Sequence, residues 1–134
     1  MVDRSRCAPA QKNKRFVMEN NALKNKTTAL SLSVIRLYRT LNRDRGNEVL
    51  ARQLLRSATS IGANVREAVY GLSRADFIAK MQIALKETAE TEYWIELLRD
   101  SDTLPPESCA ELLQDCVEIK RILIATLKSC KSTP

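Results

Sequence analysis

Residues 53–98 read QLLRSATSIGANVREAVYGLSRADFIAKMQIALKETAETEYWIELL, and they decide the fold because they join two helical patterns through one short connection. At about 100° per residue, Leu54, Ile61 and Val65 fall on one side of the first pattern. Four arginines fall on the other side: Arg45, Arg52, Arg56 and Arg66. The small residues around Gly62 predict a close approach of another backbone, because glycine inside a helix costs about 1 kcal/mol relative to alanine.

The connection between these two patterns carries helix-end signals. Gly71 is placed to end the first helix in a left-handed turn. Ser73 and Asp76, three residues apart, predict a capping box at the start of the next helix.

Two outer helices complete the pattern. Leu23, Leu30 and Val34 recur at helical spacing between Asn21 and Leu41, and prolines 105 and 106 open a last helix. The expected core face of that helix is Cys109, Leu112, Leu113, Cys116, Ile119, Leu123 and Leu127. Short connections then predict an all-α, antiparallel up-down-up-down four-helix bundle. Its expected division is a basic, disordered tail at 1–17, the bundle at 18–130 and a short tail at 131–134.

The same central stretch resembles the four-helix-bundle family encoded in intervening sequences of bacterial large-subunit (23S) ribosomal RNA genes. The matching residues are Arg56-Ser57, Ser60 to Asn64, Glu67, Asp76-Phe77, Ala84 to Glu87, Glu90-Thr91 and Tyr93-Trp94. Arg66 departs from the family pattern, which often has a small residue there, and Met18-Glu19-Asn20 resembles the usual start. The resemblance implies a bundle that assembles into a ring, typically a pentamer, and nucleic-acid binding is the function usually suspected. More distant relatives are accessory variability proteins of diversity-generating retroelements, which assist a reverse transcriptase.

The third helix, roughly residues 74–99, has two apolar sides. Phe77, Met81, Ala84, Thr88 and Ile95 form the first, whereas Ile83, Trp94, Leu97 and Leu98 form the second. The second side, flanked by Glu87 and Glu90, is expected to contact another subunit, with Trp94 as its anchor. The alternative is that both sides are buried within one broad core.

Charge is the main functional signal. Residues 1–42 hold nine Lys and Arg against two acids, a surplus of seven, while residues 43–134 hold thirteen against fourteen. The expected phosphate contacts are Arg4, Arg6, Lys12, Lys14, Arg15, Arg36, Arg39, Arg43, Arg45, Arg52 and Arg66. A solvated basic face with a tail that aids solubility is the alternative. Sequence-specific recognition is not indicated, because no zinc-finger spacing is present and the aromatic residues, Tyr70 among them, are expected mostly to pack in the bundle.

Other function classes are less well supported. The chain has no histidine and no phosphate-binding glycine loop, so neither an enzyme nor a cofactor or metal site is expected. The carboxylates Glu67, Glu87 and Glu90 are better explained by an ion pair with Arg56. Cys109 and Cys116 are expected as buried free thiols, because seven helical residues span about 10.5 Å. No apolar run is long enough for a membrane span or a signal peptide, so a cytoplasmic protein is expected.

The sequence therefore predicts a cytoplasmic, non-enzymatic, ring-forming bundle that binds RNA or DNA through backbone phosphates. The alternative is a protein-interaction scaffold that docks on a partner such as a reverse transcriptase.

Overall fold

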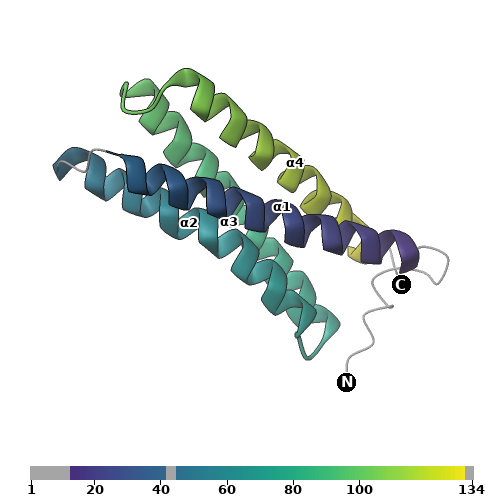
Figure 1. The fold of residues 1–134 in the computed structure, drawn as a ribbon. Coiled ribbons are helices and arrows are strands. Elements are labelled where there is room, and N and C mark those ends of the chain that lie inside the picture. Colours follow the sequence, from purple (N-terminus) through teal and green to yellow (C-terminus); the bar gives the residue numbers. More distant parts are fainter. Residues whose placement is uncertain (1–12, 42–44, 132–134) are drawn as a thin grey trace.

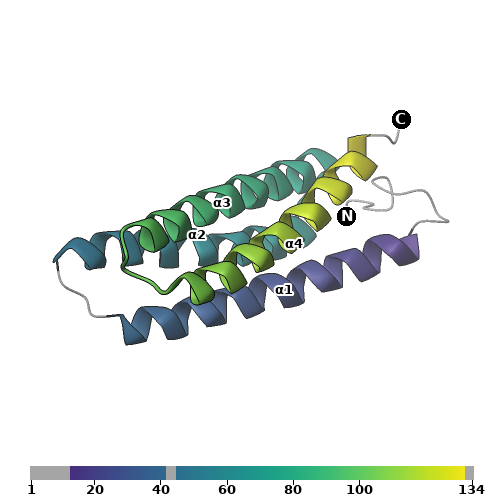
Figure 2. The same cartoon turned by 90° about the horizontal axis from the view of Figure 1, so that it is seen from above.

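The computed structural model describes residues 13–41 and 45–131, and the side chains of residues 20–41 and 46–131. These ranges form four helices: α1 (Asn13–Thr40), α2 (Arg45–Val69), α3 (Arg74–Asp100) and α4 (Pro106–Lys131). Consecutive helices run in opposite directions and pack side by side, and α4 returns along α1 (Figure 1, Figure 2). The predicted all-α up-down four-helix bundle is confirmed.

One stripe of each helix builds the core. In α1 this stripe contains Leu23, Leu30 and Val34, as its spacing predicted. The largest fully buried side chains from the other helices are Leu54, Ile61, Val65, Phe77, Met81, Ile95, Leu98, Ile119 and Leu123. The burial of each such side chain stabilises the fold by about 1.5–3 kcal/mol. The core therefore determines which side of each helix faces inward.

The close approach predicted at Gly62 is present between α2 and α1. A Cβ atom at Gly62 would lie 3.2 Å from Thr27 Oγ1 and 3.4 Å from Thr27 Cβ. Thr27 is itself buried, and its hydroxyl donates to the carbonyl of Leu23 at 2.7 Å. Displacing this buried and hydrogen-bonded side chain would be unfavourable, so glycine suits the close contact of the two helices.

The connection between α2 and α3 differs from its prediction. Gly71 has no positive φ, so the expected left-handed turn is wrong. The glycine is needed for space instead, since a Cβ atom would lie 3.2 Å from both the Ala68 carbonyl oxygen and Asp76 Cβ. Ser73 caps α3 as predicted by accepting from the Asp76 N–H at 3.0 Å. The Asp76 carboxylate, however, accepts from the N–H of Leu72, at 3.2 Å, rather than from that of Ser73.

A left-handed residue does occur at the end of α3. Asp102 has φ 58°, and its N–H donates to the Arg99 carbonyl at 3.1 Å. The next N–H, of Thr103, donates to the Leu98 carbonyl at 2.9 Å. These two bonds form a Schellman turn in which aspartate occupies the position usually taken by glycine. The turn buries Leu104 and places Pro106 at the first position of α4.

Helix α1 begins at Asn13, earlier than the expected start at Asn21. Residues 13–17 were assigned to a disordered tail, but they are helical, because no glycine or proline interrupts the chain between residues 13 and 41. The start of α1, the end of α4 and the α2–α3 connection all lie at one end of the bundle (Figure 1). We call this the terminal end.

Candidate nucleic-acid interface

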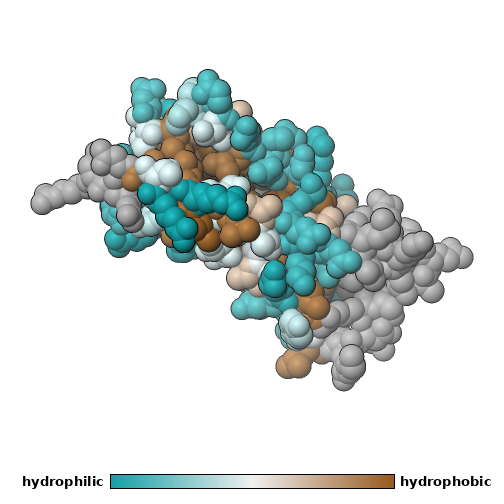
Figure 3. Space-filling model, in the orientation of Figure 1, coloured by the Kyte–Doolittle hydropathy of each residue, from teal (hydrophilic) through white to brown (hydrophobic). Residues whose placement is uncertain are grey.

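Three exposed cations of α1 lie away from its core stripe, whereas a fourth, Lys26, pairs with Glu118 of α4. Lys24, Arg36 and Arg39 are all exposed, which agrees with the outward direction expected for the two arginines. Between residues 20 and 41 the chain contains no acidic residue. Figure 3 shows very hydrophilic side chains lying over an apolar area on this face, toward the end where α1 meets α2.

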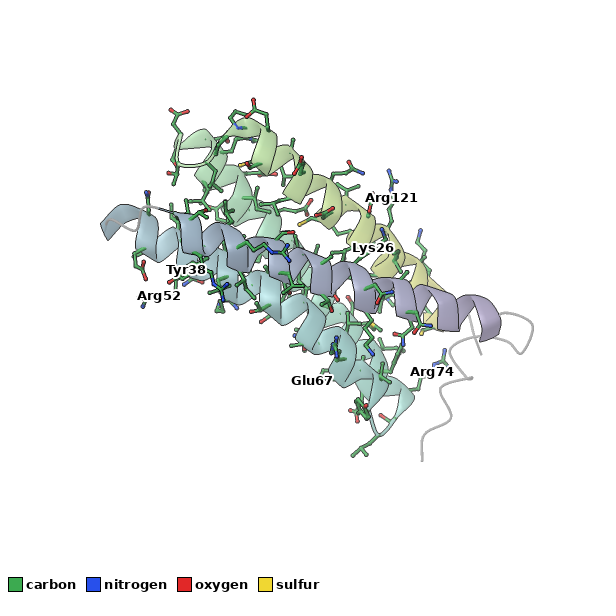
Figure 4. All side chains as sticks on the ribbon, viewed as in Figure 1. Lys26, Tyr38, Arg52, Glu67, Arg74 and Arg121 are labelled. Atoms are coloured by element: carbon green, nitrogen blue, oxygen red, sulfur yellow. The ribbon has the colours of Figure 1, made fainter. Side chains whose placement is uncertain are left out.

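A three-residue cluster links the C-terminal part of α1 to the first turns of α2. Tyr38 Oη donates to Glu48 Oε1 at 3.1 Å, and Arg52 Nη2 donates to the same oxygen at 2.8 Å. The hydrogen bond from Arg52 to Glu48 raises the pKa of this arginine. The Arg52 side chain remains 71% exposed, and Figure 4 shows it beside Tyr38 on the outer surface. A guanidinium has five N–H donors, so Arg52 is oriented by Glu48 and still has donors for an anion.

Arg66 lies further along α2, toward the terminal end. It is exposed, and its Nη2 donates to Thr28 Oγ1 of α1 at 3.3 Å. Arg52 and Arg66 therefore border the seam between α1 and α2. Together with the outward cations of α1, they give this side of the bundle a positive surface.

Arg56 belongs to a different surface, where α2 meets α3. Its Nη1 lies 3.5 Å from Glu87 Oε2, and its Nη2 donates to Glu90 Oε1, so the expected ion pair is present. Trp94 Nε1 also donates to Glu90 Oε1, at 3.2 Å. The hydrogen bond from Arg56 lowers the pKa of Glu90. Glu67, also considered for this pair, instead contacts Lys80 at 3.0 Å, because it lies further along α2, near the first turns of α3.

The second apolar side of α3 is partly open. Ile83 is 40% exposed, while Trp94 and Leu97 are half-buried. Tyr93 is 54% exposed, and its ring centroid lies 5.2 Å from that of Trp94. The assignment of Leu98 to this side is wrong, since Leu98 is fully buried in the core, at the boundary between the two sides.

The acidic residues of the N-terminal half of α4 lie away from the α1–α2 seam. Glu118 pairs with Lys26 of α1 at 2.9 Å, one α4 turn beyond Asp115. Burial raises the pKa of Asp115, and the nearby Glu118 raises it further. The N-terminal half of α4 is thus acidic, and Lys120 and Arg121 follow it on the same helix.

The described cysteines are buried free thiols. Cys109 and Cys116 lie in the core as predicted, and Cys130 is also fully buried. Burial raises the pKa of Cys109 and raises that of Cys116 to about 12. Within the part of the chain that the structure describes, no group of three His, Cys, Asp or Glu residues could hold a metal ion.

Several expected phosphate contacts lie outside the described residues or side chains. These are Arg4, Arg6, Lys12, Lys14, Arg15, Arg43 and Arg45. Conversely, Tyr70 was expected to pack in the bundle but is 82% exposed, so that prediction is wrong. The signal was present in the sequence, because Tyr70 lies four residues after Arg66 of the arginine stripe and directly before Gly71.

The fold and the surface together define a four-helix bundle with a basic side. The residues that the structure describes contain no cluster that could hold a metal ion. The chain matches the sequence model of the 23S rRNA-intervening sequence protein family over residues 19–125, and it belongs to this family. A crystal structure from Bacteroides thetaiotaomicron, of a protein of unknown function in the S23 ribosomal protein family, is 43% identical with a TM-score of 0.78. The similarity covers 82% of this chain and 98% of that chain. No curated protein matches the sequence significantly. None of the described helices is long and apolar enough to cross a membrane.

Proposed function

We propose that this protein is a non-enzymatic nucleic-acid-binding bundle that contacts the backbone phosphates of RNA or DNA with little sequence preference. The observation that carries the proposal is the outward side of α1, where Lys24, Arg36 and Arg39 are exposed and no acidic residue lies between positions 20 and 41. Arg52 and Arg66 extend this surface across the seam to α2. Cations arranged along a helix surface attract a polyanion and release its counterions.

The non-enzymatic part of the proposal rests on side-chain chemistry. The sequence has no histidine. The described thiols are buried, and burial raises the pKa of Cys109 and of Cys116, which disfavours the reactive thiolate. Glu87 and Glu90 are held in an ion pair with Arg56, and the hydrogen bond from Arg56 lowers the pKa of Glu90, which makes Glu90 a poor proton donor.

The proposal includes assembly into a ring-shaped homo-oligomer, with a pentamer favoured. The surface for it comprises Ile83, Trp94 and Leu97, with Glu87 and Glu90 at its edge. Partly exposed apolar side chains on an otherwise charged helix are typical of an interface. A ring would repeat the basic seam around one axis and strengthen its field. Trp94→Glu should reduce the mass measured by light scattering, because a charge buried without a partner is costly. A wild-type mass equal to one chain would contradict the ring.

Binding is tested by replacing Arg36 and Arg39 with Gln. The double variant should bind a short RNA or DNA duplex more weakly, and each lost phosphate contact should reduce the slope of log K against log salt by about 0.9 on DNA. A matched control, Lys86→Gln with Arg121→Gln, removes the same charge from exposed positions on α3 and α4. It should change the slope less. Equal effects of the two pairs, or no retention of nucleic acid by the wild type at low salt, would contradict the proposal.

The basic residues before α1 are tested separately. Because α1 begins at Asn13, the deletion should stop at residue 12 so that the helix remains whole. Removal of residues 1–12 takes away Arg4, Arg6 and Lys12 and should weaken binding further, with the thermal unfolding midpoint unchanged. Affinity equal to that of the full chain would restrict the interface to the helices.

The second candidate is a protein-interaction scaffold that docks on a partner such as a reverse transcriptase. The observation that favours it is again the open apolar side of α3, which a partner protein could cover as well as another subunit. The two functions differ in their response to salt. Binding through the apolar surface around Trp94 should change little with ionic strength, whereas phosphate binding should weaken steeply.

A further inference from the structure

Two large side chains stand out from the terminal end of the bundle. Tyr70 is 82% exposed and Leu72 is 83% exposed, and both belong to the connection between α2 and α3. They are the most exposed of the large apolar and aromatic residues in the part of the chain that the structure describes. In Figure 3, a hydrophobic area lies at the lower edge of the coloured surface, near the connection between α2 and α3 in Figure 1.

The backbone of this connection is held by hydrogen bonds at successive residues. The N–H of Tyr70 donates to the Glu67 carbonyl at 3.0 Å, and the N–H of Gly71 donates to the Ala68 carbonyl at 3.1 Å. The N–H of Leu72 donates to the Asp76 carboxylate at 3.2 Å. The ring of Tyr70 is therefore presented from an ordered turn, which reduces the entropy that a ligand must remove on binding.

Arg66 lies in the last turn of α2, four residues before Tyr70. Tyr70 follows directly after the helix, where its N–H donates to the Glu67 carbonyl. Both side chains are exposed, and Arg66 has no carboxylate partner within the described part of the chain, where Nη2 donates to the Thr28 hydroxyl. An exposed cation and an exposed aromatic ring four residues apart supply the two groups that the phosphate and the base of a nucleotide require.

Further cations are found at the terminal end. Lys128 and Lys131 are exposed in the last turn of α4, at the same end of the bundle. Arg74 Nη2 donates to the Cys130 carbonyl, which joins the start of α3 to the end of α4. Two acidic residues also lie at this end of the bundle. Glu67 is paired with Lys80, and the Asp76 carboxylate accepts from the N–H of Leu72 at the start of α3. Both of these acidic groups are therefore engaged within the bundle.

We propose that Arg66 and Tyr70 form a subsite for an unpaired nucleotide, in which Arg66 binds the phosphate and the Tyr70 ring stacks on the base. This inference rests on the proposed nucleic-acid binding and makes it specific for single strands. In a duplex both faces of a base are covered by its neighbours, whereas an unpaired base offers a free face to an aromatic ring. Any base has such a face, so the subsite requires no particular sequence.

The test uses the full chain and a short single-stranded RNA that carries a fluorescent adenine analogue, together with the duplex of the same sequence. Wild type should quench the analogue in the single strand, because stacking quenches its emission, and should leave the duplex signal nearly unchanged. Tyr70→Ala should weaken single-strand binding by at least about fivefold, the lower end for one stacked base, and should abolish the quench. Duplex affinity should stay close to that of the wild type.

Three further variants separate stacking from other roles. Tyr70→Phe keeps the ring and should bind like the wild type, whereas Tyr70→Leu keeps apolar area without a ring and should resemble Tyr70→Ala. Arg66→Gln should lower the salt slope on single strands by about 0.7 while part of the quench remains at saturation. Since Tyr70 is exposed, its variants should unfold at the wild-type temperature, so a loss of binding cannot be a loss of fold.

The possible failures are distinct. If the wild type retains neither strand form at low salt, the proposed function itself fails. If the wild type binds but Tyr70→Ala weakens single strand and duplex equally, or weakens neither, the stacking subsite is wrong and the seam alone carries binding. A fall in oligomer mass on Tyr70→Ala would assign the exposed ring to a contact between subunits and would also overturn the subsite.

Discussion

The hydroxyl oxygens of Ser57 in α2 and Thr91 in α3 lie 2.9 Å apart and share a hydrogen bond inside the core. Both residues are fully buried. Each hydroxyl also has a carbonyl within its own helix, that of Leu54 for Ser57 and that of Glu87 for Thr91. This pair is a buried polar contact between two helices that are also joined at their exposed edges by the ion pairs of Arg56 and Glu67.

Ser57→Ala should therefore destabilise the bundle by about 1 kcal/mol, the usual net value of an internal hydrogen bond. Urea unfolding followed by circular dichroism measures the change. The matched control is Thr59→Ala on the same helix, because that hydroxyl donates only to carbonyls of α2 within the described structure. An equal loss in both variants would show that the bond to Thr91 contributes nothing of its own.

Gly62→Ala tests the contact between α2 and α1. Alanine favours the helix by about 1 kcal/mol, but its Cβ would press on buried Thr27, so we expect no gain or a loss of stability. In a Thr27→Ala background the obstructing hydroxyl is gone, and the same substitution should become stabilising. A double-mutant cycle measured by thermal unfolding compares the two backgrounds. Identical effects in both would exclude the contact as the reason for this glycine.

The ion pair at Arg56 predicts a dependence of stability on pH. The pKa of Glu90 is lowered in the folded state, so its contribution is present above the unfolded pKa, about 4.3, and is lost as pH falls through the folded value. Arg56→Gln should therefore reduce stability at neutral pH and much less under acidic conditions. Because the Arg56 side chain is 47% exposed, added salt should also reduce the difference. A gap between wild type and variant that is constant with pH would contradict this assignment.

Cysteine labelling tests the core of α4. In a Cys7→Ser chain, the remaining thiols at 109, 116 and 130 are all buried, and the pKa of Cys116 is about 12. They should react slowly with a thiol reagent in the folded protein and rapidly in urea, because only the exposed thiolate is nucleophilic. Rapid labelling under native conditions would mean that the end of α4 opens readily.

The sequence predicts those features that depend on periodicity within one helix. Leu23, Leu30 and Val34 are buried and Arg36 and Arg39 are exposed for this reason. Features that depend on a neighbouring helix are harder to predict from the sequence. The need for glycine at position 71 follows from the close approach of Asp76. The ion pair between Glu67 and Lys80 depends on which turns of α2 and α3 lie side by side. Tyr70 was assigned to packing because an aromatic residue usually packs, and its exposure depends on where α2 ends.

The common position of the α1 start and the α4 end has a consequence for engineering. An even number of antiparallel helices brings Asn13 and Lys131 to one end of the bundle, so the chain is suited to circular permutation. Joining the two termini and opening the chain at the α3–α4 turn, near exposed Asp102, should preserve all four helices and their packing. The new ends would emerge at the end of the bundle opposite Tyr70. A fluorophore or affinity tag placed there would report on binding without crowding the exposed ring.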